Sequence, residues 1–161
     1  LIVLLVLLAD EVVWDDGDFL FLGVFLIGPG VIYELAARYT GNRAYKFALG
    51  LALGAALLLL WVNGAVGIIG DDGNDANLMY NGVPAIGLIG VFIARLKPQG
   101  MEHAMYATAG AQVLVFVIAL VVGWGFTGPI TLFFVAMWLG SARLFRQAAT
   151  EVTPAGAVAE G

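Results

Sequence analysis

The sequence predicts an all-α integral membrane protein, a bundle of about six transmembrane helices of which the first is incomplete. Three observations predict this fold class. The composition is 61% hydrophobic and only 12% charged, whereas water-soluble domains carry about a quarter charged residues. Long apolar runs recur along the chain. Basic and acidic residues alternate between the connections that separate these runs, which is typical of a chain that crosses a membrane repeatedly.

A helix needs about 20 mostly apolar residues to cross the roughly 30 Å hydrocarbon core of a bilayer. Residues 1–9 are too short, and we interpret them as the end of a first helix whose beginning is missing. Residues 19–37 are long enough and contain one acid, Glu34. Residues 47–70 contain no charge and span comfortably, whereas the uncharged residues 78–94 are marginal in length.

The last two expected spans come from one long apolar segment that is too long for a single crossing. Turn-forming residues from Gly123 to Pro129 interrupt it, and they predict a hairpin of two helices over residues 104–124 and 129–146. Residues 1–147 therefore form one transmembrane bundle. Residues 148–161 are small and polar enough to be a disordered cytoplasmic tail.

The distribution of charge predicts the orientation of the chain. The loops at 38–46 and 95–103 are basic, whereas the loops at 10–18 and 71–77 contain acids and no base. Because basic loops stay on the cytoplasmic side, we expect both termini and both basic loops to be cytoplasmic. The seven basic residues form three clusters along the chain: Arg38, Arg43 and Lys46; Arg95 and Lys97; and Arg143 and Arg146.

Polar residues inside the expected spans are the first candidates for a site, because each is expensive to place in lipid. They are Glu34, Asn63, Asn81 and Gln112. Hydrogen bonds between helices explain the three amides. Glu34 is either a proton or cation carrier open to the cytoplasm or the partner of Arg38, one helical turn away. We favour the ion pair, with both side chains reaching the membrane surface.

Acidic residues in the outer loops are the second candidates, because carboxylate oxygens are ligands for divalent cations. Their spacing is not that of an EF-hand, so we favour solvated loops over a metal site. The weak candidate ligands are Asp15, Asp16, Asp18, Asp71, Asp72 and Asp75.

Small residues are abundant, with 22 glycines in the chain. In lipid they allow helix backbones to approach closely. We expect tight contacts within the bundle at the recurring glycines of the two expected spans at 47–70 and 78–94: Gly50, Gly54, Gly64, Gly67, Gly70, Gly87 and Gly90. The pair Gly50 and Gly54 has GxxxG spacing, for which a homodimer face is the alternative.

Catalytic function is not expected. The sequence has no cysteine, a single histidine, His103, and no nucleotide-binding, hydrolase or metalloprotease motif, so neither an enzyme nor a cofactor is predicted. We interpret the chain as a non-catalytic polytopic membrane protein, an accessory or structural subunit of a larger complex. The alternative is a small transporter or channel for a proton, cation or small solute. Its expected partners are the lipid bilayer and other membrane-protein subunits, and no nucleic acid.

Several segments carry a resemblance to a known family: DEVVWDDGDF (10–19), YELAAR (33–38), WVNGAVGIIG (61–70) and IARLKPQGM (93–101). On these segments the chain resembles a family of small uncharacterised polytopic inner-membrane proteins of bacteria. The resemblance implies a bacterial inner-membrane location and a similar number of helices. It implies no functional residue, because the family has no assigned activity.

Overall fold

The computed structural model of the chain describes residues 15–65, 67–68 and 75–160. These residues form five α-helices and one short 3-10 helix: α2 (Asp16–Tyr39), α3 (Arg43–Ala65), η1 (Asp75–Asn77), α4 (Leu78–Ala94), α5 (Pro98–Val122) and α6 (Gly128–Glu160). Helices α2, α3, α5 and α6 are long and apolar enough to cross a membrane, and α4 is shorter. The all-α membrane class is confirmed. The expected count of six is not, and the expected span at residues 1–9 lies outside the described residues.

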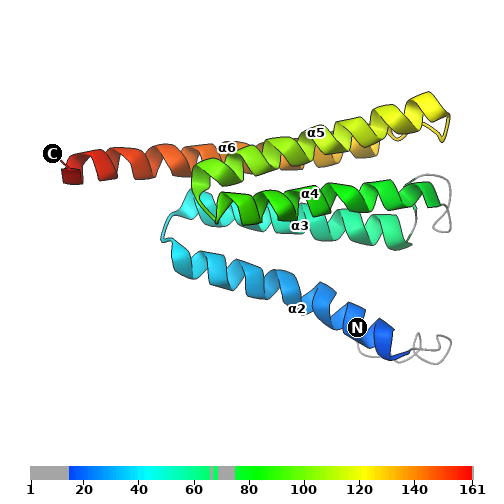
Figure 1. Cartoon of the computed structure of the whole chain (residues 1–161), viewed down its shortest axis with the longest axis horizontal. Coiled ribbons are helices and arrows are strands. Elements are labelled where there is room, and N and C mark those ends of the chain that lie inside the picture. The colour runs from blue at the N-terminus through cyan, green and yellow to red at the C-terminus, as the bar shows by residue number, and fades with distance from the viewer. Residues whose placement is uncertain (1–14, 66, 69–74, 161) are drawn as a thin grey trace.

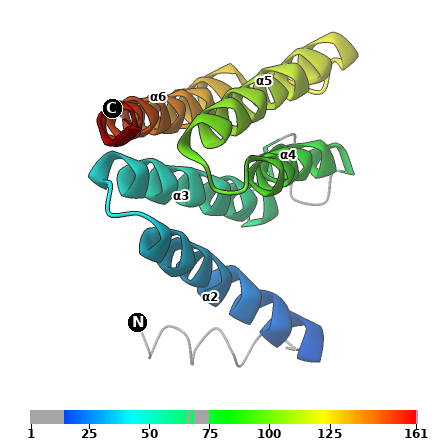
Figure 2. The same cartoon turned by 60° about the vertical axis from the view of Figure 1, so that its left-hand side comes forward.

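Helices α3 to α6 pack against one another, whereas α2 lies to one side (Figure 1). Within the bundle, α5 packs on α4 and α6, and α3 packs on α6. Large side chains from α3, α4 and α6 fill the core; the bulkiest fully buried ones are Trp138, Tyr45, Tyr80, Phe134 and Phe145. Among the described helices, α2 packs mainly on α3, and its first half diverges from the bundle in both views (Figure 2).

Helix ends differ from the expected spans because hydropathy detects only the part of a helix that lies in hydrocarbon. Helix α5 begins at Pro98, six residues before the expected start at 104, since proline suits the first helical position, where no N–H donor is needed. Helix α3 likewise begins at Arg43 rather than 47. The basic loops are therefore shorter than expected. The end of α3 differs in the opposite sense: the helix stops at Ala65, before the expected residue 70, and Gly67 beyond it adopts a positive φ of 77°.

Helix α6 continues to Glu160, through the segment that we expected to be disordered from residue 148. Ala148 is fully buried, and Asn42 Nδ2 donates a hydrogen bond to Glu151 Oε2 at 2.6 Å. The tail therefore begins as packed helix. Its alanines are strong helix formers, a property that a reading based on polarity alone overlooks. At about 1.5 Å per residue, α6 is longer than a bilayer is thick, and it extends past its neighbours (Figure 1).

The helices alternate in direction, so that the basic residues gather at one end of the molecule (Figure 1). Arg38 lies in the last turn of α2, Arg43 begins α3, and Arg95 and Lys97 occupy the turn between α4 and α5. The basic part of α6 lies beside the start of α3, where Ser141 Oγ donates to the Ala48 carbonyl at 2.7 Å. The three basic clusters of the sequence thus lie at one end of the bundle.

Candidate functional site

The polar residues predicted inside the spans do not form one site. Asn63 and Asn81 come together, because Asn63 Nδ2 donates to Asn81 Oδ1 at 2.8 Å and to the Asn77 carbonyl at 2.7 Å. Asn77 Oδ1 in turn accepts from the Ile68 N–H at 2.9 Å. This asparagine cluster joins the end of α3 to the start of α4. Its role is structural, because it fixes the connection between the two helices, and Asn77 was not predicted to take part in it.

Gln112 lies elsewhere, on the buried face of α5. Its Nε2 and Oε1 atoms are both buried and have no hydrogen-bond partner among the described residues. The prediction that Gln112 forms a hydrogen bond between helices is therefore wrong among the described residues. Trp138 Nε1 and Thr131 Oγ1 are unpaired in the same way. Other buried hydroxyls are paired, as Tyr80 Oη is with Thr127 Oγ1 at 2.7 Å.

Glu34 lies on the exposed surface of α2, away from the interior amides. Arg38 Nε donates to Glu34 Oε1 at 3.1 Å, so the predicted ion pair is confirmed. The shallow hollow beside Glu34 is lined by α2 residues alone. Glu34 therefore has no buried partner on a neighbouring helix among the described residues.

The candidate metal ligands near α2 have a local structural role. Asp15 Oδ1 accepts from the Asp18 N–H at 2.9 Å, and Asp18 Oδ2 accepts from the Asp15 N–H at 3.0 Å. The two carboxylates thus form a capping box that satisfies N–H groups at the start of α2, and Asp16 follows in the first turn. Across the part of the chain that the structure describes, no three acidic, histidine or cysteine residues gather. Asp71 and Asp72 lie outside that part, and Asp75 begins η1.

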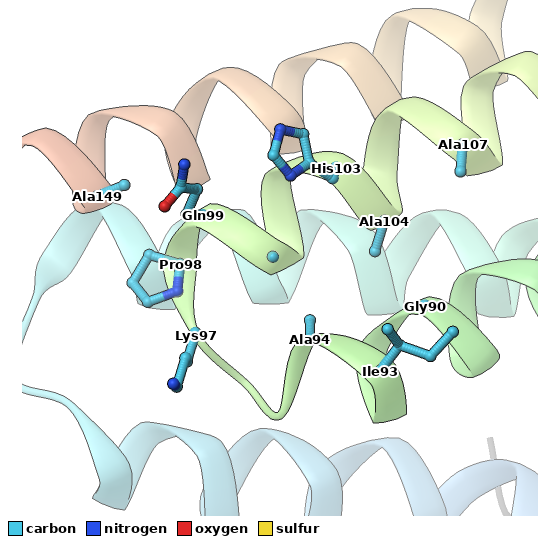
Figure 3. Close-up of a pocket in the computed structure, with 11 residues that line it drawn as sticks. Gly90, Ile93, Ala94, Lys97, Pro98, Gln99, His103, Ala104, Ala107 and Ala149 are labelled. Carbon is cyan, nitrogen blue, oxygen red and sulfur yellow. The ribbon is translucent and has the colours of Figure 1, made fainter.

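A groove between α4 and α5 is the most distinctive hollow at the basic end (Figure 3). It has a volume of about 760 Å³ and is bordered on one side by Ala149 of α6. Small and apolar residues line its inner half, and polar side chains line the half at the turn: Lys97, Gln99 and His103. This groove was not predicted from the sequence, because residues 95–103 were expected to form a loop, whereas α5 begins at Pro98. The repeated small residues before and after Pro98 were the available signal.

The turn beside this groove has an unusual backbone. Arg95 and Leu96 both adopt positive φ, at 51° and 62°, a region that costs residues other than glycine roughly 1–2 kcal/mol each. Tyr45 Oη donates a hydrogen bond to the Leu96 carbonyl at 2.8 Å. The fully buried Tyr45 ring packs edge-on against the ring of Phe145, with 5.2 Å between the ring centroids. Helices α3 and α6 therefore hold the α4–α5 turn in place.

A second hollow of about 210 Å³ lies where α2 meets α3 and α4. Apolar side chains line almost all of it, including Pro29 and Pro84, and the ring of Trp138 forms part of its wall. Both prolines lie inside continuous helices. A further apolar hollow lies between the first half of α2 and the end of α3, lined by Phe21 and Phe25 of α2 and by Leu60 and Trp61 of α3. We call the gap between α2 and α3 that contains both hollows the wedge.

These observations define the class of the protein: it is a multi-pass helical membrane protein by the length and composition of its helices. The chain matches no family model, and neither a curated protein nor a solved structure is significantly similar to it. The resemblance to a bacterial family is therefore not supported by these comparisons.

Proposed function

We propose that the protein is a non-catalytic accessory or structural subunit of a larger complex in the bacterial inner membrane. The position of α2 is the observation that supports this function. Only 6% of the residues in the most apolar stretch of α2 are buried, compared with 28–33% of the residues in the corresponding stretches of α3, α5 and α6. A span with so little contact with the other described helices leaves most of its surface for lipid or for another protein.

The shape of the α2 surface adds to this support. Its first half carries a dense set of exposed large apolar residues: Phe19, Leu20, Phe21, Val24, Leu26 and Ile27. The wedge between α2 and α3 is wide enough to leave hollows on both sides of Pro29. In lipid, close packing and not hydrophobicity drives association of helices, so a partner helix that fills this wedge gains contacts that lipid chains make less well.

The transporter alternative has less support. A carrier site requires polar groups that converge on a water-filled path. Glu34 lies on the outer surface of α2, whereas Asn63, Gln112 and Thr131 are buried inside α3 to α6. The hollow where α2 meets α3 and α4 has an apolar lining.

We expect Val24→Trp on α2 to release a partner subunit that co-purifies with the wild-type protein in mild detergent. Val24 is 63% exposed on the proposed contact surface, and an indole there blocks close packing of a second helix. Val121→Trp on α5, where the valine is 80% exposed, is the matched control and should retain the partner. The measurement is the stoichiometry of the complex by quantitative mass spectrometry.

A protein that purifies as a monomer, or a complex that tolerates both tryptophan variants equally, would contradict the accessory role. Flux of protons or solute through reconstituted protein would then favour the transporter alternative.

The proposed orientation, with the basic end of the bundle in the cytoplasm, has its own test. The chain has no cysteine, so single cysteines report their side of the membrane directly. We expect an impermeant thiol reagent added to intact cells to modify Asp16→Cys and Trp124→Cys, and to leave Gly41→Cys and Gln99→Cys unmodified. All four positions are exposed in the described structure. The reverse labelling pattern would invert the assignment.

A further inference from the structure

The floor of the α4–α5 groove is made of small residues because the two helices approach closely there. Gly90 lies against Ala104, and Gly100 lies against Ala94; a Cβ atom on either glycine would come within 2.7 Å of the alanine Cβ. Figure 3 shows Ala104 and Gly90 facing each other across this contact. With Ala107 continuing the lining along α5, the result is a furrow with no large side chain in its floor.

The polar end of the groove is basic. Lys97 is exposed and precedes the first turn of α5, which contains no acid. The described side chains that line the groove include Lys97 and His103 and no carboxylate. The single ion pair found among the described residues joins Arg38 to Glu34, on α2. The groove therefore complements an anion at this end.

The other end of the groove lies in the spanning part of the helices. Ile93 borders it and is 78% exposed, and its neighbour Phe92 is 74% exposed, so this side of α4 faces hydrocarbon. An occupant that fits both ends has an anionic group at the turn and an apolar chain along the furrow. Free phosphate gains nothing from the apolar half. The volume of about 760 Å³ is within the roughly 300–1,000 Å³ of sites that hold small molecules.

We propose that the groove between α4 and α5 binds an anionic phospholipid of the bilayer, with its phosphate beside Lys97 and an acyl chain over Gly90, Ala104 and Ala107. This site goes beyond the accessory role, because it does not depend on α2 or on a partner protein. The turn that carries Lys97 is held by Tyr45 through Leu96, so the cation is presented from a fixed backbone.

The test uses the full chain in mild detergent with phosphatidylglycerol and phosphatidylcholine at equal concentration, and native mass spectrometry counts the bound lipid. We expect phosphatidylglycerol to be retained preferentially. Lys97→Gln should reduce its retention about fivefold, the effect of one basic residue near an anionic surface. Arg143→Gln is the matched control, since Arg143 is exposed at the same end but outside the groove, and should change retention less than twofold.

The apolar half has its own pair of variants. Ala107→Phe fills the furrow and should reduce retention of phosphatidylglycerol, whereas Val113→Phe, exposed on α5 outside the groove, should not. Melting temperatures of all four variants within a few degrees of wild type exclude unfolding as the cause. Equal retention of the two lipids, equal effects of Lys97→Gln and Arg143→Gln, or displacement of the lipid by millimolar inorganic phosphate would overturn the proposal.

Discussion

Gly100→Ala will destabilise the bundle by about 1–3 kcal/mol, the cost of adding a methyl group to a closely packed contact. The new Cβ would lie 2.7 Å from Ala94 Cβ and 2.9 Å from Ala94 Cα. Because the Cα belongs to the backbone of α4, rotation of a side chain cannot relieve this overlap. The two helices must move apart at the turn. A lower melting temperature of the purified protein in detergent is the measurement.

The same helix supplies the control. Gly110 also lies in α5, but a Cβ added there would meet no atom within 4 Å. Since alanine has a higher helix propensity than glycine by about 1 kcal/mol, Gly110→Ala should leave the melting temperature unchanged or raise it. If the two variants melt at the same temperature, the close approach of α4 and α5 is wrong. Gly82→Ala and Gly90→Ala repeat the comparison on α4, because a Cβ on Gly90 would overlap Ala104 whereas one on Gly82 would meet no atom within 4 Å.

The sequence predicts the helical membrane class well, because the length and apolarity of a span depend on the bilayer and not on neighbouring helices. It also predicts that the basic residues share one end, since each crossing reverses the direction of the chain. The ion pair between Glu34 and Arg38 follows from their spacing on one helix. These features are local, and no knowledge of tertiary contacts is needed to derive them.

Features that depend on contacts between helices were not predictable in this way. The 24-residue helix α2 and the 25-residue helix α5 have similar hydropathy, at 2.0 and 2.2, yet α2 is peripheral and α5 is central. Hydropathy cannot separate them, because lipid and a neighbouring helix are equally apolar. For the same reason the GxxxG pair was ambiguous: a Cβ on Gly50 would lie 3.7 Å from the Tyr33 ring of α2, whereas Gly54 is open.

The candidate site shows the same division. Asn63 and Asn81 were predicted as polar residues inside spans, but Asn77, whose carbonyl accepts the second hydrogen bond from Asn63, lies at the end of an expected loop and was not predicted to join them. The groove beside Lys97 depends on the left-handed turn at Arg95 and Leu96. Positive φ at two residues other than glycine has no clear sequence signal, so the position of Lys97 relative to α4 emerges only from the structure.

Gln112→Met will raise the melting temperature, whereas most substitutions of a residue buried in the centre of a helix bundle lower it. The side chain of Gln112 is fully buried, and neither of its amide atoms has a partner among the described residues. An unsatisfied buried polar group costs about 1–3 kcal/mol, and methionine fills a similar volume without this cost. The stabilisation should be of that order, measured by thermal unfolding in detergent.

Asn63→Leu is the comparison that gives this result its meaning. Asn63 is also buried, and its Oδ1 atom has no partner among the described residues, but its amide nitrogen donates two hydrogen bonds. The leucine variant removes both of these bonds and should melt at a lower temperature. A polar group that destabilises the folded chain and is nevertheless present is a candidate for function. If Gln112→Met instead lowers the melting temperature as Asn63→Leu does, then the amide is satisfied in the folded protein. Gln112 would then be a structural residue of the bundle, and its amide would not be available to a solute or partner.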